Sequence, residues 1–350
     1  MTNSPALVRT EARTQPEART RPEPVWPALQ EALATRHPGA LDRLAGAAPV
    51  DERDELLCLL AAYDLDMAPL EQLGPIARRQ RHPTVIELRN RLEDRLLGRL
   101  RTAVPDHVLP SDPDDVVATI RAVAARDLLP PIYDWAADRA TGTRLRAFLA
   151  LEGGPDGGFD DLVALAQVGL AGDPKVELAR NYWDEMGRGR PDEVHTDLHR
   201  RMARAAGLPR VRREDLPVEA LARAVLGPFL ATNRWLQPEL LGALGLTELQ
   251  AGPRCRKVLL GLHRTGAPAD ALPFYEEHAH TDPRHGKDWL VQVVTPLARR
   301  PLWAAGLVRG ARWRAAVNDR FFAAMARRFG AVPPGWPAGA TAGGPPVVRG

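Results

Sequence analysis

The sequence predicts an all-α fold. Between residues 25 and 331 the apolar residues recur mostly three and four positions apart, which is the spacing of one face of a helix. Some of these runs open with acidic residues or with a capping residue, as the N-termini of helices prefer. Runs that alternate Val, Ile, Thr and aromatic residues with polar ones are not found, so the sequence offers no convincing strand.

Four runs near the N-terminus have helical spacing. Residues 25–37 and 40–48 each place apolar residues three and four positions apart. Residues 51–66, DERDELLCLLAAYDLD, open with a charged first turn, which favours the start of a helix. Residues 82–104 predict a long amphipathic helix with acid–base pairs on its polar face. Together these runs predict a helical segment that ends near residue 105.

The remaining helices belong to a larger C-terminal bundle. The first of them lies in residues 111–127, where Ser111 or Asp112 can cap the helix and Pro113 stands near its first position. Further helices are predicted at residues 128–152, 158–170, 174–187, 191–206, 216–231, 238–250, 253–264, 268–281, 284–298 and 310–329.

The chain therefore divides into four predicted regions. Residues 1–24 are rich in Arg, Thr, Pro and Glu without periodicity, and residues 332–350 are equally poor in helix formers, so both are expected to be disordered tails. Between them we expect an N-terminal helical segment at residues 25–105 and a helical bundle at residues 106–331. No internal repeat is visible.

Composition excludes several classes of function. In 350 residues, 47 basic and 44 acidic side chains are spread along the chain, and this balance argues against a nucleic-acid partner. The N-terminus has no apolar segment typical of a secretory signal, and no stretch approaches the length of a membrane span. Cys58 and Cys255 make neither a disulfide framework nor a zinc-finger pattern. We expect a cytoplasmic protein without a membrane partner.

Residues 274–289, FYEEHAHTDPRHGKDW, are the first candidate for chemistry. On a helix with about 100° per residue, Asp282 and His285 fall about 40° and −20° from His278, so all three share one face. Imidazole and carboxylate suit iron, manganese or zinc. Pro283 interrupts the segment, because proline removes a backbone hydrogen bond inside a helix. The segment alone is compatible with either a metal site or a solvated helix end.

Residues 177–202 form the second candidate segment. Glu185 ends one predicted helix, Gly187 and Gly189 interrupt it, and a new helix carrying His195 follows. Such a kinked pair can bring an acid and a histidine toward one centre. Asp192 and His195 also form the acid-x-x-His pair of carboxylate-bridged di-iron bundles. The same acids could instead decorate a charged helix–turn–helix.

Two isolated acids complete the set of candidates. Glu152 follows the apolar run from Phe148 to Leu151, and Glu248 stands on an otherwise apolar helix. Burying such an acid is costly unless a partner compensates it. Each acid alone is better explained by a helix end that reaches water than by a metal ligand. Because four helical segments each offer an acid, a histidine or both, however, the set favours a metal site in the core of the bundle.

The two longest motifs resemble a known family. Asn-Tyr-Trp-Asp-Glu-Met-Gly-x-Gly followed by His195, and Phe-Tyr-Glu-Glu-His-x-x-x-Asp-x-x-His, are similar to motifs of the iron-containing redox enzymes of the heme-oxygenase-like superfamily. These are also called heme-oxygenase-like di-iron oxidases and oxygenases. The resemblance covers about residues 140–300. It implies a heme-oxygenase-like seven-helix bundle, with the N-terminal helical segment as an addition that the resemblance does not explain.

The resemblance also implies a set of ligands. Glu248 would be an additional ligand or a group behind the ligands, and Asp192 is a weaker candidate because Glu185 competes for its role. The implied metal ligands are Glu152, Glu185, His195, His278, Asp282 and His285.

The function that the resemblance implies is oxidation of a small molecule. A non-haem di-iron oxidase or oxygenase, with two Fe ions or an Mn/Fe pair and O2 as co-substrate, would hydroxylate, desaturate or cleave an amine, amino acid or carboxylic acid. Whatever the function, the N-terminal helical segment could suit partner binding or formation of a homodimer.

Two alternatives remain at this stage. One is a metal-free enzyme of the same superfamily, either a cofactor-free oxidase or a thiaminase-like hydrolase that would need Cys255 as a nucleophile, although nothing in the sequence places that thiol near the histidines. The other is a non-enzymatic helical interaction protein, in which the six predicted ligands would scatter over the surface.

Overall fold

The computed structural model describes residues 23–35, 37, 39–106, 110, 112–153 and 158–332. Throughout this part of the chain every regular element is a helix and none is a strand, which confirms the predicted all-α class. The predicted tails at 1–24 and 332–350 lie outside the described residues, apart from residues 23, 24 and 332.

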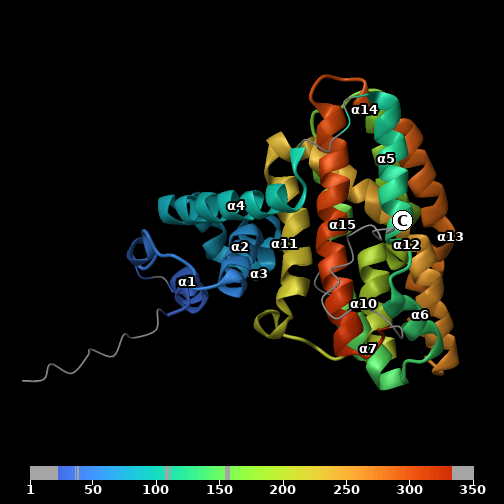
Figure 1. The fold of residues 1–350 in the computed structure, drawn as a ribbon. Helices are drawn as coiled ribbons and strands as arrows, with labels where there is room; N and C mark the ends of the chain where they lie inside the picture. The colour runs from blue at the N-terminus through green and yellow to red at the C-terminus, as the bar shows by residue number, and fades with distance from the viewer. Residues whose placement is uncertain are drawn as a thin grey trace, which may run out of the picture.

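The N-terminal segment is a small group of helices on one flank of the bundle. Its elements are α1 (Val25–Ala34), η1 (Asp42–Leu44), α2 (Glu52–Met67), α3 (Leu70–Leu73), η2 (Gly74–Arg81) and α4 (Pro83–Ala103). Figure 1 shows this group beside α11 (Val218–Thr232), against which α2 packs. Polar contacts join the two parts. Arg320 donates to Glu52 at 2.6 and 2.8 Å, and Asn233 donates to Glu93 at 3.0 Å.

The bundle contains the longest helices, which run in roughly the same direction in Figure 1. The α-helices besides α11 are α5 (Pro113–Arg126), α6 (Pro131–Asp138), α7 (Gly142–Glu152), α8 (Phe159–Ala166), α9 (Asp173–Glu185), α10 (His195–Ala206), α12 (Gln237–Arg264), α13 (Pro273–Asp288), α14 (Thr295–Ala298) and α15 (Trp303–Arg328). Shorter turns are η4 (Gly187–Gly189), η5 (Pro191–Glu193), η6 (Arg213–Asp215), η7 (Arg234–Leu236) and η8 (Ala269–Ala271), and a π-helix, η9, spans Trp289–Val294. The central helix is α12, which packs along both α13 and α15.

Several predicted boundaries were wrong. Residues 40–48 contain only the short turn η1, and the helix predicted at 128–152 is broken between α6 and α7, where Thr141 caps the second piece. The last long helix begins at Trp303 and not at residue 310. Asp112 caps α5 by accepting from the amide of Asp114 at 2.8 Å, while Ser111 lies outside the described residues.

Two prolines that were expected to separate helices do not do so. Pro253 lies inside α12 and Pro283 lies inside α13. Proline at position 283 leaves the carbonyl of Ala279, four residues earlier, without its helical donor. Arg256 of α12 donates to that carbonyl at 2.9 Å. A contact between helices thus replaces the missing hydrogen bond, and the helix continues through the candidate ligands.

Close contact between α12 and α13 depends on two glycines. A Cβ at Gly252 would lie 2.9 Å from Cδ of Pro283, and one at Gly286 would lie 3.0 Å from Cα of Leu249. The absent side chains let the two backbones approach closely. This approach sets Glu248 on α12 directly opposite the ligand face of α13.

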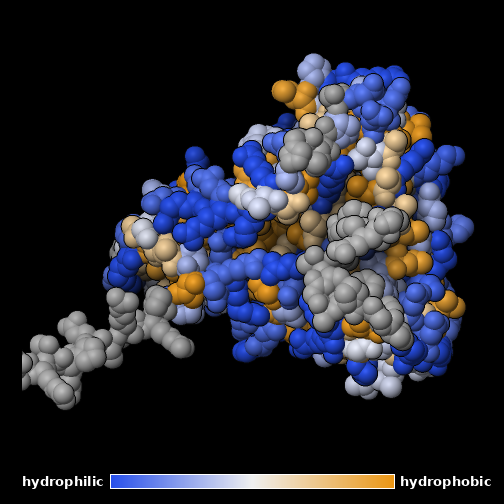
Figure 2. Space-filling model, in the orientation of Figure 1, coloured by the Kyte–Doolittle hydropathy of each residue, from blue (hydrophilic) through white to orange (hydrophobic). Residues whose placement is uncertain are grey.

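The surface is mostly hydrophilic. Figure 2 shows hydrophobic side chains gathered in a recess between the N-terminal helices and the bundle, on the face in view. Among the described helices, none has the length and apolar character that crossing a membrane requires.

Candidate metal centre

The connection between α9 and α10 places an acid and a histidine face to face. Glu185 is the last residue of α9 and His195 is the first of α10. The chain reverses at Gly187, where φ is 60° and a Cβ would lie 2.6 Å from the backbone carbon of Glu193. Only glycine fits there without strain. Pro191, expected to start α10, begins the short turn η5 instead.

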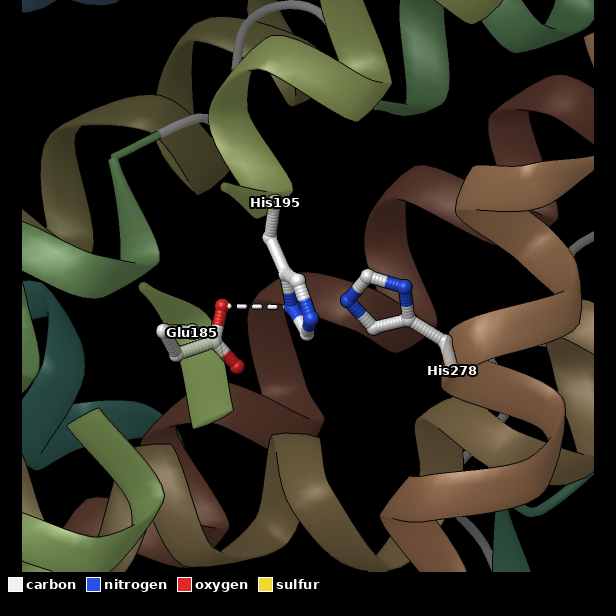
Figure 3. Close-up of side chains that lie close together, drawn as sticks. All are labelled: Glu185, His195 and His278. Carbon is white, nitrogen blue, oxygen red and sulfur yellow. Dashed lines mark ion pairs between the residues drawn. The ribbon is translucent and has the colours of Figure 1, made fainter. Parts of the chain in front are cut away.

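Glu185, His195 and His278 form the first group of side chains that could hold a metal ion. Figure 3 shows them converging from α9, α10 and α13. Nδ1 of His195 lies 2.8 Å from Oε2 of Glu185, and the two imidazole rings have centroids 4.6 Å apart. Nδ1 of His278 donates to the carbonyl of Phe274 at 2.6 Å, which leaves Nε2 with the lone pair that a metal ligand needs.

A second group shares Glu185 with the first and adds Glu248 and His285. Nδ1 of His285 lies 3.6 Å from Oε2 of Glu248, whose other oxygen accepts from the amide of Asn181 at 2.7 Å. The ligand atoms within each group all lie within 4.8 Å of one another. Two such groups joined by one carboxylate have the chemistry of a two-metal site with a bridging acid.

Asp282 lies at the edge of the second group. Its Oδ1 is 4.0 Å from Nδ1 of His285, and the residue is 2% exposed. Burial raises the pKa of Asp282 well above its usual value, and the neighbouring carboxylates of Glu248 and Glu185 raise it further. A cation bound between these acids would offset both the cost of burying the charge of Asp282 and the repulsion between the carboxylates.

The nearby acids raise the pKa of two of the three histidines, His285 and His195, whereas burial and the neighbouring His195 lower the pKa of His278. Burial opposes protonation of His285, but Glu248 and Asp184 more than offset it and raise the pKa of that imidazole to about 9. Burial likewise opposes protonation of His195, and contact with Glu185 raises the pKa of His195 above its usual value. The centre is therefore organised to attract positive charge.

A further observation indicates that these residues fit a metal ion. Three buried atoms of the centre have no hydrogen-bond partner among the described residues, namely Nδ1 of His195, Nδ1 of His285 and Oδ2 of Asp282. Buried polar atoms normally find such partners, because leaving one unpaired costs about 1–3 kcal/mol. Nδ1 of His195 is close to Glu185 but not in hydrogen-bond geometry, as expected for two atoms that coordinate the same ion.

Two of the predicted residues are placed differently. Glu152 lines the same cavity as His195 and His278, but it belongs to neither group. Its Oε1 accepts from the hydroxyl of Tyr133 at 3.0 Å and lies 3.8 Å from Nη2 of Arg223. Asp192 is exposed on η5 and also belongs to neither group, because the turn between Gly187 and Val194 directs His195 inward and leaves Asp192 outside.

Sequence reasoning missed Asp184, which orients a candidate ligand. Its Oδ2 accepts from Nε2 of His285 at 2.9 Å and from Arg284 at 2.5 Å. Because Nε2 donates to Asp184, the lone pair of His285 is on Nδ1, toward Glu248. The only signal in the sequence was that Asp184 precedes Glu185, and adjacent residues on a helix do not share a face.

We expect Asp184→Ala to weaken iron binding about 10- to 100-fold, because His285 would lose the acceptor that fixes its orientation. Competition against a chromophoric chelator measures this affinity. Asp173→Ala, at the exposed start of the same helix, is the matched control and should leave affinity unchanged. Equal affinity of the Asp184 variant and the unmodified protein would contradict the role assigned to Asp184.

Cys255 lies closer to the centre than the sequence indicated. It lines the same cavity as His195 and His278. Burial raises the pKa of its thiol well above the usual value, and the acids Asp282 and Glu152 raise it further. A nucleophilic cysteine needs the opposite shift, because only the thiolate attacks. The environment of Cys255 therefore does not favour a thiaminase-like role.

Comparison with known proteins identifies the family of the bundle. Residues 146–319 match the family model described as iron-containing redox enzyme, and no curated protein matches the chain. The match spans α9, α10, α12 and α13, which carry all the members of the two groups. It confirms the resemblance inferred from the motifs and the heme-oxygenase-like bundle that the resemblance implied. The bundle, over residues 146–319, belongs to the family of iron-containing redox enzymes.

Proposed function

We propose that this protein is a non-haem di-iron oxidase or oxygenase that uses O2 to oxidise a small organic molecule. The observation that carries the proposal is the sharing of Glu185 between two groups, each of which has its own histidine. Glu185 would bridge the ions, with His195 and His278 on one and with His285 and Glu248 on the other. Asp282 is close enough to join the second ion after a small adjustment of its side chain.

When bound, two irons would supply the electrons that O2 needs. The protein's own contribution is to hold the ligands in place, to keep water out and to position the substrate. Asp184 and Phe274 orient His285 and His278 through their second nitrogens. Apolar residues of α11 and α12 form a wall of the adjoining cavity. An Mn/Fe pair would accept the same ligands.

Metal analysis tests the proposal directly. Protein prepared without O2 and loaded with Fe(II) is expected to hold about two irons per chain, and an O2 pulse should then change its optical spectrum. Loading with mixed Mn(II) and Fe(II) identifies the preferred pair. His278→Ala should retain about one iron, because only the first group loses a ligand. Failure of the unmodified protein to bind iron, with no effect of His278→Ala, would contradict the proposal.

The non-enzymatic alternative is disfavoured by the positions of the residues. It requires the predicted ligands to scatter over the surface. Instead Glu185, His195, Asp282 and His285 are buried. His278 lies on α13 with Asp282 and His285, and it belongs to one group with Glu185 and His195. A solubilising role does not account for acids and histidines that are removed from water together.

A further inference from the structure

The cavity beside the candidate metal centre is long. It has a volume of about 850 Å³, and its lining residues on α12 begin at Leu240, end at Val258 and recur every three or four positions. This spacing is one face of a helix. At about 1.5 Å per residue the lined face is ~27 Å long. Glu248 lies near its middle, so the cavity extends in both directions from the centre.

One of these two arms is apolar. From Glu248 toward the start of α12 its wall contains Thr247 beside Glu248 and then the apolar residues Leu244, Ala243 and Leu240, over a length of ~12 Å. Helix α11 precedes α12 in the chain and packs beside it, and it contributes Leu226 and Leu230. We call this half of the cavity the apolar arm.

The N-terminal segment reaches the far end of the apolar arm. Arg89 of α4 donates both to Asp66, at the end of α2, and to Thr232, at the end of α11. Met67, which follows Asp66 in the sequence, and Pro69 line the cavity at this end. Both lie outside residues 146–319, which match the family model. The N-terminal helices therefore supply part of the binding cavity and do not only pack against the bundle.

The opposite arm is mixed, because polar groups line it together with apolar residues such as Ala251 and Val258. From Glu248 toward the end of α12 its wall includes Arg254, Tyr133, Glu152 and Asn318. Arg254 is held by the carbonyls of Asp127 and Leu128. The two arms thus differ in chemistry on either side of the same carboxylate.

We propose that the apolar arm binds an unbranched alkyl chain of the substrate, whose polar group lies at the carboxylates and histidines. This inference rests on the proposed function for the reacting end of the molecule, but binding in the arm does not require iron. Each methylene buried in the arm should tighten binding about fourfold, until the chain fills the arm.

The test uses the full chain without metal, titrated calorimetrically with n-alkylamines, n-alkyl carboxylates and n-alkyl alcohols from butyl to dodecyl. For the unmodified protein, affinity should rise with each methylene and then level off. Comparison of the three series shows which polar group the centre accepts. Affinity that is independent of chain length in all three would overturn the proposal.

Two matched variants show where in the cavity the alkyl chain of the ligand binds. Ala243→Phe fills the apolar arm, so the rise in affinity should stop at a shorter chain. Ala251→Phe makes the same substitution on the same face of α12, on the other side of Glu248, and should keep the increment per methylene even if all affinities fall. The assignment to the apolar arm would be overturned if the rise in affinity stopped at the same shorter alkyl chain in both variants, or at a shorter alkyl chain only in Ala251→Phe.

A smaller substitution keeps the proposal testable if Ala243→Phe does not fold. A Cβ at Gly227, which also lines the cavity, would lie 2.7 Å from the end of the Leu162 side chain. Gly227→Ala should therefore narrow the cavity by displacing that side chain, and should shorten the longest tight-binding chain. An unchanged length dependence in this variant and in folded Ala243→Phe would reject the proposal. Because these titrations contain no iron, their outcome is independent of the iron-loading experiment.

Discussion

Glu185→Ala is expected to abolish stoichiometric iron binding. Glu185 is the one residue common to both groups, so its loss leaves each potential ion with fewer protein ligands and without a bridge. His278→Ala and His285→Ala each remove a ligand from a single group and should retain about one iron per chain. Iron analysis after anaerobic loading and desalting measures all three variants under the same conditions.

The matched control is Glu177→Ala. Glu177 is a buried acid on the same helix, but it pairs with Arg180 at 3.3 Å and lies outside both groups. This variant should bind as much iron as the unmodified protein. If Glu185→Ala instead loses no more iron than His278→Ala, Glu185 does not bridge and the two groups are not one centre. Far-UV circular dichroism of each variant without metal separates loss of ligands from loss of fold.

The helical spacing of apolar residues was enough to predict most of the elements, because each amphipathic helix buries one face. It failed at Pro253 and Pro283, where local propensity predicts a break. In α13 the carbonyl left free by Pro283 accepts from Arg256, which lies on another helix, α12. Tertiary contacts of this kind have no local signature, so the sequence alone could not show that His278 and His285 share one continuous helix.

The candidate site was predictable where the spacing of residues determines their direction. On a helix that continues through Pro283, periodicity places His278, Asp282 and His285 on one face, and the glycines after Glu185 indicated the reversal toward His195. The contacts of Glu152 were not predictable, because Tyr133 lies on a separate helix whose break from α7 was missed. Asp184 was missed for a related reason, because its partner His285 is 101 positions away in the sequence.

The position of Glu248 also depends on a contact between the backbones of two helices, in which no side chain of an acid or histidine takes part. Helix α12 crosses α15 at two glycines that face the opposite backbone. A Cβ at Gly242 would overlap the carbonyl oxygen of Leu307, and one at Gly310 would overlap that of Glu239. Backbone atoms cannot rotate away as a side chain can, so the helices must separate if either glycine gains a methyl group.

We expect Gly310→Ala to lower the free energy of unfolding by about 1–3 kcal/mol, even though alanine is the better helix former by about 1 kcal/mol. Gly98→Ala in α4 is the matched control, since Gly98 is exposed in a helix and a Cβ there would meet nothing within 4 Å. The free energy of unfolding of this control should rise by about 0.5–1 kcal/mol. Urea denaturation measures both variants. Because α12 carries Glu248, Gly310→Ala should also weaken iron binding, and equal stabilisation of the two variants would contradict the close crossing of α12 and α15.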